Sequence, residues 1–181
     1  MNGWLDEIYR SKRSALYGLA LSITREPAAA EDAVHDAVLR LARKADEPEG
    51  DAVAYVFRAV RNAALDQLRQ RQRGVSGKTL GQTVDEKNGH AGPDVWLFAD
   101  PGPCPAQQTE QAEQQHRLMH EVEQLPDAQR EVIVMKVFGG LTFQQIADAG
   151  DAPLSTVASR YQRGLARLKE QMENRYEPAS A

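Results

Sequence analysis

The 181-residue chain has few of the features that mark secreted or membrane proteins. Its single cysteine, Cys104, excludes an internal disulfide and favours a reducing compartment. No apolar run approaches the about 20 residues that a transmembrane helix needs. Residues 1–7 lack the basic and apolar segments of a signal peptide. We therefore expect a cytoplasmic protein that does not insert into a membrane.

Aromatic residues make up only 6% of the chain, and runs with strand-like alternation are scarce. The apolar content of 41% is still enough for a packed core. Long stretches rich in Ala, Leu, Gln, Arg and Glu favour helices. The sequence predicts an all-α fold of two small helical domains joined by a flexible linker, within a length that allows one large or two small domains.

Groups arranged for catalysis or metal binding are also missing. His116 and His120 are four residues apart, but no third and fourth metal ligands are evident. Cys104 lies in a Pro-Gly segment without a paired base. We expect no metal, no cofactor and no catalytic residue, so the protein is not predicted to be an enzyme.

An excess of positive charge is absent as well, because the net charge is −4. The basic residues are nevertheless concentrated in two segments. Residues 52–73 hold five arginines against one aspartate, and residues 154–170 hold four basic residues against one glutamate. Two basic segments on an acidic chain indicate two local contacts with nucleic acid and protein partners for the remaining surface.

Residues 142–168 are the most informative segment and have the pattern of a helix, a tight turn and a second helix. Gly150 is expected to end the first helix in the left-handed conformation, and Pro153 prevents its continuation. Ser155 or Thr156 could cap the second helix. Five apolar residues of the second helix recur at helical spacing and are expected to face a core: Leu154, Val157, Tyr161, Leu165 and Leu168.

The opposite face of this second helix is basic and rich in hydroxyl groups. Such a helix fits the major groove of DNA, where Arg and Gln pair with base edges and Ser or Thr binds phosphate. An alternative interpretation is a surface helical hairpin with a solvated basic face. The expected DNA-binding residues are Ser155, Thr156, Ser159, Arg160, Gln162, Arg163 and Arg167.

The remaining sequence divides into helical segments and a linker. Three helices are expected at about 4–24, 28–44 and 51–73, in a domain spanning residues 1–73. Residues 74–106 read as a linker, whose apolar cluster at 96–98 is expected to dock onto the chain's own domains. The second domain, residues 107–173, begins with a helix to about 125, and a frayed tail covers 174–181. A further helix at 127–138 is expected to bury Val132, Ile133, Met135 and Val137.

Four motifs in register resemble the extracytoplasmic-function (group IV) sigma-70 factors. Residues 61–69 have the pattern Arg-Asn-x-x-x-Asp-x-x-Arg of the family's promoter −10 helix, and residues 30–40 resemble its polymerase-binding helix. Residues 125–132 and 140–147 resemble its −35-binding domain. The resemblance covers about 4–73 and 107–170 in the family's order.

The resemblance implies a sigma factor that binds the clamp helices and the flap region of RNA polymerase core. It also implies that the factor directs the polymerase to promoter DNA. It also implies an anti-sigma partner. The implied polymerase-binding residues are Glu31, Asp32, His35 and Asp36. The implied −10 residues are Arg58, Arg61, Asn62, Asp66 and Arg69, and the helix at 154–170 would bind the −35 element.

Other interpretations remain at this stage. A helix-turn-helix regulator that acts without core polymerase would use only the C-terminal domain, and a helical adaptor would not recognise promoters at all. For the third helix, a solvated end with Asp66 paired to Arg69 or Asn62 would explain the same pattern.

Overall fold

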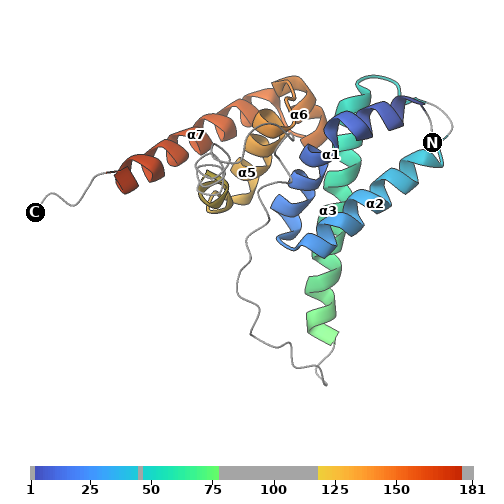
Figure 1. Ribbon diagram of the computed structural model, residues 1–181, viewed down its shortest axis with the longest axis horizontal. Helices are drawn as coiled ribbons and strands as arrows, with labels where there is room; N and C mark the ends of the chain where they lie inside the picture. The colour runs from blue at the N-terminus through green and yellow to red at the C-terminus, as the bar shows by residue number, and fades with distance from the viewer. Residues whose placement is uncertain (1–2, 45–46, 78–117, 177–181) are drawn as a thin grey trace, which may run out of the picture.

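A computed structural model describes residues 3–44, 47–77 and 118–176 of the chain. Within these ranges every regular element is helical, so the predicted all-α class is confirmed (Figure 1). Most of the expected linker, its cluster at 96–98, the expected domain start near 107 and the last tail residues lie outside the described ranges. No helix in the described part is long and apolar enough to cross a membrane.

Three helices form the N-terminal region: α1 (Gly3–Thr24), α2 (Pro27–Ala42) and α3 (Ala52–Gly77). Between α1 and α2 the chain turns within two residues, because Arg25 adopts a positive φ of 56° and Pro27 occupies the first turn of α2. Helix α3 continues four residues beyond the expected end at 73. The three helices pack on one another around buried side chains that include Leu16, Phe57 and Val60.

The C-terminal region consists of a helical stretch at 118–123, α5 (Asp127–Ile133), the π-helical turn η2 (Val134–Phe138), α6 (Phe143–Gly150) and α7 (Leu154–Tyr176). The single helix expected at 127–138 therefore ends in a wider turn, in which the Gly139 N–H donates to the Val134 carbonyl at 3.1 Å. Val137 is 53% exposed, and its predicted burial is wrong, because the π turn rotates the last residues relative to an α-helix.

The two regions pack directly against each other. Helix α6 lies against α3, and α5 and η2 lie against α1 (Figure 1). One cluster of buried side chains runs through both regions, from Leu5 and Phe57 to Ile146 and Val157. The distal ends of α3 and α7 extend from this body in different directions (Figure 1). The two predicted helical units thus share a continuous core in this structure.

Candidate nucleic-acid interface

The helix–turn–helix expected at 142–168 is formed by α6 and α7. Thr142 begins α6 with a capping box, in which its hydroxyl accepts from the Gln145 N–H and the Gln145 side chain accepts from the Thr142 N–H. At the other end of α6, Asp151 adopts the left-handed conformation, with φ 50°. The prediction that Gly150 would do so is wrong by one residue, since Gly150 is still helical.

The start of α7 also differs from the expectation. The Pro153 carbonyl accepts the N–H groups of Thr156 at 2.9 Å and Val157 at 3.1 Å, so α7 begins at Leu154. Ser155 and Thr156 therefore lie inside the first turn, and neither is the cap that the sequence suggested. The turn between the helices is shorter than a cap at either residue would allow.

The buried stripe of α7 is displaced from the predicted one. Val157 and Leu168 are buried and Tyr161 is half-buried, where its ring meets Phe143 edge-on at a centroid distance of 5.3 Å. Leu154 and Leu165 were expected in the core but are 48% and 42% exposed.

Gly164 explains this displacement. A Cβ on Gly164 would lie 3.1 Å from Cγ1 of Ile133, so the glycine lets α7 approach α5 closely. The covered side of α7 carries the buried Val157, Gly164 and Leu168 and the half-buried Tyr161, which follow the helical period. Leu165 is consequently left beside the contact rather than within it.

The outer face of α7 keeps most of the predicted DNA-binding residues accessible. Ser155, Gln162, Arg163 and Arg167 are exposed. Thr156, Ser159 and Arg160 are half-buried, and the Ser159 hydroxyl donates to the Thr156 carbonyl at 2.9 Å. This face combines three arginines with a glutamine, which suits contacts with phosphates and base edges.

The expected −10 face of α3 divides into free and paired side chains. Arg58 and Asn62 are exposed. Arg69 is exposed and donates to Asp66 at 3.1 Å, the local pairing that the alternative interpretation anticipated. Arg61 is half-buried, because its Nε donates to Oε2 of Glu131 in α5 at 2.7 Å. The structure therefore brings one of these side chains to the other region of the protein.

The expected polymerase-binding residues gather on the outer face of α2. Glu31, Asp32 and His35 are exposed, and Asp36 is half-buried with its carboxylate 4.0 Å from the Arg40 guanidinium. On the opposite face of α2, Ala33, Val34, Ala37 and Leu41 are buried. The helix thus presents an acidic surface while its apolar side packs in the core.

Contacts between the two regions could not be anticipated from the sequence. The Lys12 ammonium donates to the Gly139 carbonyl at 2.9 Å, and the Gln145 amide donates to the Asp51 carboxylate at 2.8 Å. The Ala54 N–H lowers the pKa of Asp51, partial burial opposes that change, and Gln145 adds to it. Neighbouring residues carry no signal for contacts that span about a hundred positions.

Arg130, part of one of the recognised motifs, has a structural role here. Its side chain is only 3% exposed and donates to the carbonyls of Leu125 and, across the regions, Ser22. The side chain also pairs with Asp127, whose carboxylate in turn accepts from Arg25 at 2.9 Å. Burial lowers the pKa of the Arg130 guanidinium, and Arg25 contributes in the same direction. The residue ties the start of α5 to the end of α1.

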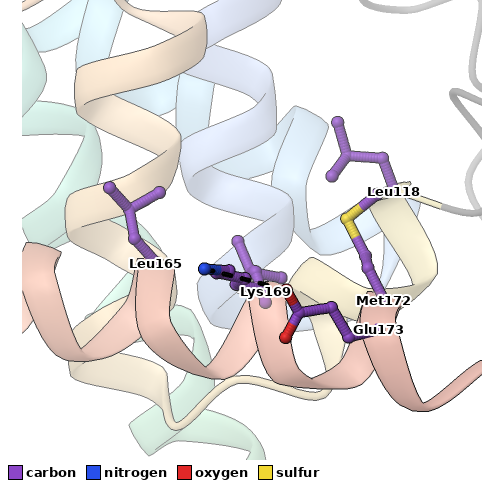
Figure 2. Close-up of a pocket in the computed structure, with 6 residues that line it drawn as sticks. Leu118, Leu165, Lys169, Met172 and Glu173 are labelled. Carbon is purple, nitrogen blue, oxygen red and sulfur yellow. Dashed lines mark ion pairs between the residues drawn. The ribbon is translucent and has the colours of Figure 1, made fainter.

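An apolar groove follows the distal half of α7. Its volume is about 540 Å³, and Figure 2 shows Leu118 and Met172 side by side at one end and Leu165 toward the other. An ion pair between Lys169 and Glu173, 3.7 Å apart, lies along the groove. Leu165 and Met172 are both more than two-fifths exposed, so this surface is open to a partner. Among the described residues, no group of His, Cys, Asp and Glu is arranged to hold a metal.

Comparison with known families matches both regions. The family described as "Sigma-70 region 2" matches residues 8–74, and the family described as "Sigma-70, region 4" matches residues 115–168. The ECF RNA polymerase sigma factor SigK of Mycolicibacterium vanbaalenii is 27% identical over 167 residues, covering 90% of this chain and 78% of the relative. SigK of Mycobacterium tuberculosis is 25% identical, covering 90% of this chain and 82% of the relative.

Solved structures share the fold. The sigma factor RpoE of Bartonella quintana, determined in complex with the anti-sigma factor NepR, aligns with a TM-score of 0.63 at 22% identity. That alignment covers 93% of this chain and 96% of RpoE. CnrH, determined with the cytosolic domain of CnrY, aligns with a TM-score of 0.59 at 18% identity, covering 94% and 88% of the two chains.

Proposed function

The chain belongs to the extracytoplasmic-function group of the sigma-70 family, and we propose that its α2, α3 and α7 surfaces divide the work of such a factor. As a sigma factor it binds RNA polymerase core and directs promoter-specific initiation. It supplies specificity to the polymerase and performs no chemistry of its own. We place this activity in the cytoplasm, where polymerase and promoter DNA are found.

One observation carries the assignment of surfaces: an acidic helix face, a basic helix face and a helix–turn–helix occur on one chain in that order. The acidic face of α2, with Glu31, Asp32, His35 and Asp36, would meet the polymerase clamp helices by charge complementarity. The exposed face of α3 would hold the opened −10 DNA. Stacking and phosphate contacts bind a single strand well where the duplex is already open.

For the −35 element, the outer face of α7 would enter the major groove. Arg160 or Arg163 would pair with a guanine edge, and Ser155 near the helix start would meet phosphate. The groove that Leu165 and Met172 line would receive an apolar segment of the polymerase flap. An anti-sigma factor is the expected antagonist. The simplest way for it to block binding of polymerase and of promoter DNA is to cover these same surfaces.

Run-off transcription tests the proposal. The full chain is added to core polymerase and a promoter library, and the transcripts are sequenced to recover the shared −35 and −10 elements. A defined promoter class that appears only when the chain is present supports the function. Equal transcription with and without the chain would contradict it.

The alternative, a helix–turn–helix regulator that needs no polymerase, is separated by co-purification. A sigma factor should retain core polymerase on an affinity column, whereas the regulator should retain none. The acidic face of α2 favours the sigma factor, because a regulator that used only α6 and α7 would have no need of it.

A further inference from the structure

The apolar groove along the distal half of α7 is not filled by any described residue. Leu165, Leu168 and Met172 line it at positions i, i+3 and i+7, which form one stripe on a helix. Leu168 is only 7% exposed, whereas Leu165 and Met172 are 42% and 44% exposed. The stripe therefore begins in the packed core and continues onto the surface, where it offers apolar side chains to a further segment.

The parts of the chain that directly adjoin the groove cannot cover it. Leu118, where the description of the C-terminal region begins, lies at one end of the groove beside Met172 (Figure 2). The eleven residues before it, 107–117, include only one apolar residue, Ala112, whose methyl group is too small to cover two long side chains. Residues 177–181, which follow α7, have no apolar side chain larger than that of proline.

One segment of the sequence does carry large apolar side chains within reach of the groove. Among residues 78–117, such side chains follow one another only at Val95, Trp96, Leu97 and Phe98. Phe98 precedes Leu118 by 20 residues, and a chain of that length spans at most about 66 Å. Helix α7 has 23 residues and is about 35 Å long, so every part of the groove lies within that span.

The size and the chemistry of the groove suit aromatic side chains. Its volume of about 540 Å³ lies within the range of about 300–1,000 Å³ that holds a drug-sized molecule, so an indole and a phenyl ring fit. Met172 offers a thioether sulfur, which makes favourable contacts with aromatic rings. Lys169, on the same stretch of α7, offers an ammonium that is attracted to the face of an indole.

We propose that Trp96 and Phe98 dock into the α7 groove of their own chain. Because the segment and the groove are covalently joined, docking is intramolecular and proceeds at an effective concentration of about 1 mM. An affinity too weak to hold two separate molecules together is then sufficient. The inference goes beyond the proposed function, since it concerns the chain without polymerase or DNA. The groove is also the one proposed for the polymerase flap, so the two segments compete for it.

The fluorescence of Trp96 tests the proposal. Trp4 and Trp96 are the two tryptophans, so Trp4→Phe leaves Trp96 as the only indole. In this background, docking should give emission at short wavelength and weak quenching by acrylamide. Leu165→Gln should shift the emission to longer wavelength and increase quenching, because it places a polar amide in the groove. Leu39→Gln on α2 is the matched control, since Leu39 is also 42% exposed. Equal emission and quenching of the two glutamine variants would overturn the proposal.

A second test keeps Trp4 and therefore does not depend on that background folding. A nitroxide is attached to Cys104, the single cysteine, which follows Phe98 by six residues. In a chain with ¹³C-labelled methionine methyl groups, the nitroxide should broaden the Met172 resonance. Trp96→Ser combined with Phe98→Ser should restore most of its intensity. A Met172 resonance that stays sharp in the parent chain would overturn docking.

A mixed sample distinguishes the chain's own segment from that of a second copy. Nitroxide-labelled chain without isotope is mixed with isotope-labelled Cys104→Ser chain, and intrachain docking predicts a sharp Met172 resonance. Broadening in the mixture would place the segment of a second copy in the groove and overturn the proposal. These tests use neither polymerase nor DNA, so their failure leaves the proposed function standing. Failure of run-off transcription would contradict that function alone.

Discussion

Gln145 donates a hydrogen bond to Asp51 across 2.8 Å, although the two residues are 94 positions apart. The same Gln145 side chain accepts from the Thr142 N–H at 2.8 Å, which completes the capping box of α6. Asp51 in turn accepts from the Ala54 N–H at the start of α3, at 2.9 Å. One amide thus links the first turn of α6 to the first turn of α3.

Loss of the capping hydroxyl should destabilise α6. Thr142→Ala removes the acceptor for the Gln145 N–H and is expected to lower the free energy of unfolding by about 1 kcal/mol, whereas Thr142→Ser should stay close to the parent. Urea denaturation followed by circular dichroism measures the difference. Equal stability of the alanine and serine variants would show that the box contributes nothing.

Asp51 should contribute to the acid sensitivity of the fold. Its pKa is lowered in the folded protein, chiefly by the Ala54 N–H, so its contribution is complete above the unfolded pKa of about 3.9. The contribution is lost as the pH falls from there through the folded pKa. Asp51→Asn should therefore lose less stability than the parent over that pH interval in denaturation curves. An equal fall in the free energy of unfolding with decreasing pH for the two proteins would contradict the prediction.

The acidic face of α2 should bind core polymerase. Asp32→Lys with Asp36→Lys should weaken binding to core enzyme in a pull-down, because the replacements reverse both charges that we propose to face a basic surface of the polymerase. Helicity should be retained, since neither residue belongs to the buried face of α2. Glu7→Lys on α1, also exposed, is the control. Unchanged retention of core enzyme by the double variant would contradict the assignment.

Two residues of α3 should differ in how they affect −10 binding. Arg69→Ala should weaken binding to all single-stranded −10 sequences alike and lower the salt dependence by about one released counterion. Asn62→Ala should instead change the sequence preference. Binding titrations at several salt concentrations, over a set of −10 sequences, separate these effects. If both variants match the parent throughout, α3 has no −10 role.

The arginines of α7 should set the −35 preference. Replacement of Arg160 or Arg163 by Ala should cost about 1–3 kcal/mol at one base position for the residue that pairs with guanine. The other replacement should weaken all sequences by a similar factor, as expected for a phosphate contact. A binding series over all single-base −35 variants, with the chain in complex with core polymerase, measures both. A flat profile for both variants would show that α7 does not read sequence.

Local chemistry in the sequence determined the helices and the approximate place of each break. Pro27 starts α2, and the sequence between Thr142 and Pro153 is sufficient to predict a helix and a turn, because capping and proline effects act within one turn of the chain. The exposed acidic face of α2 was likewise predictable from its periodicity. The end of α6 was predicted only to within one position, since both Gly150 and Asp151 can adopt the left-handed conformation that ends a helix.

Only the tertiary structure decided which sides of these helices are covered. Leu165 and Val137 have the apolarity of core residues, but the close approach at Gly164 and the π turn at 134–138 leave them exposed. Arg61 has the appearance of a free surface arginine, and its partner Glu131 is 70 residues away. Periodicity shows that a helix has an apolar side, but the partner that covers it, and the charges placed opposite one another, depend on how distant segments pack.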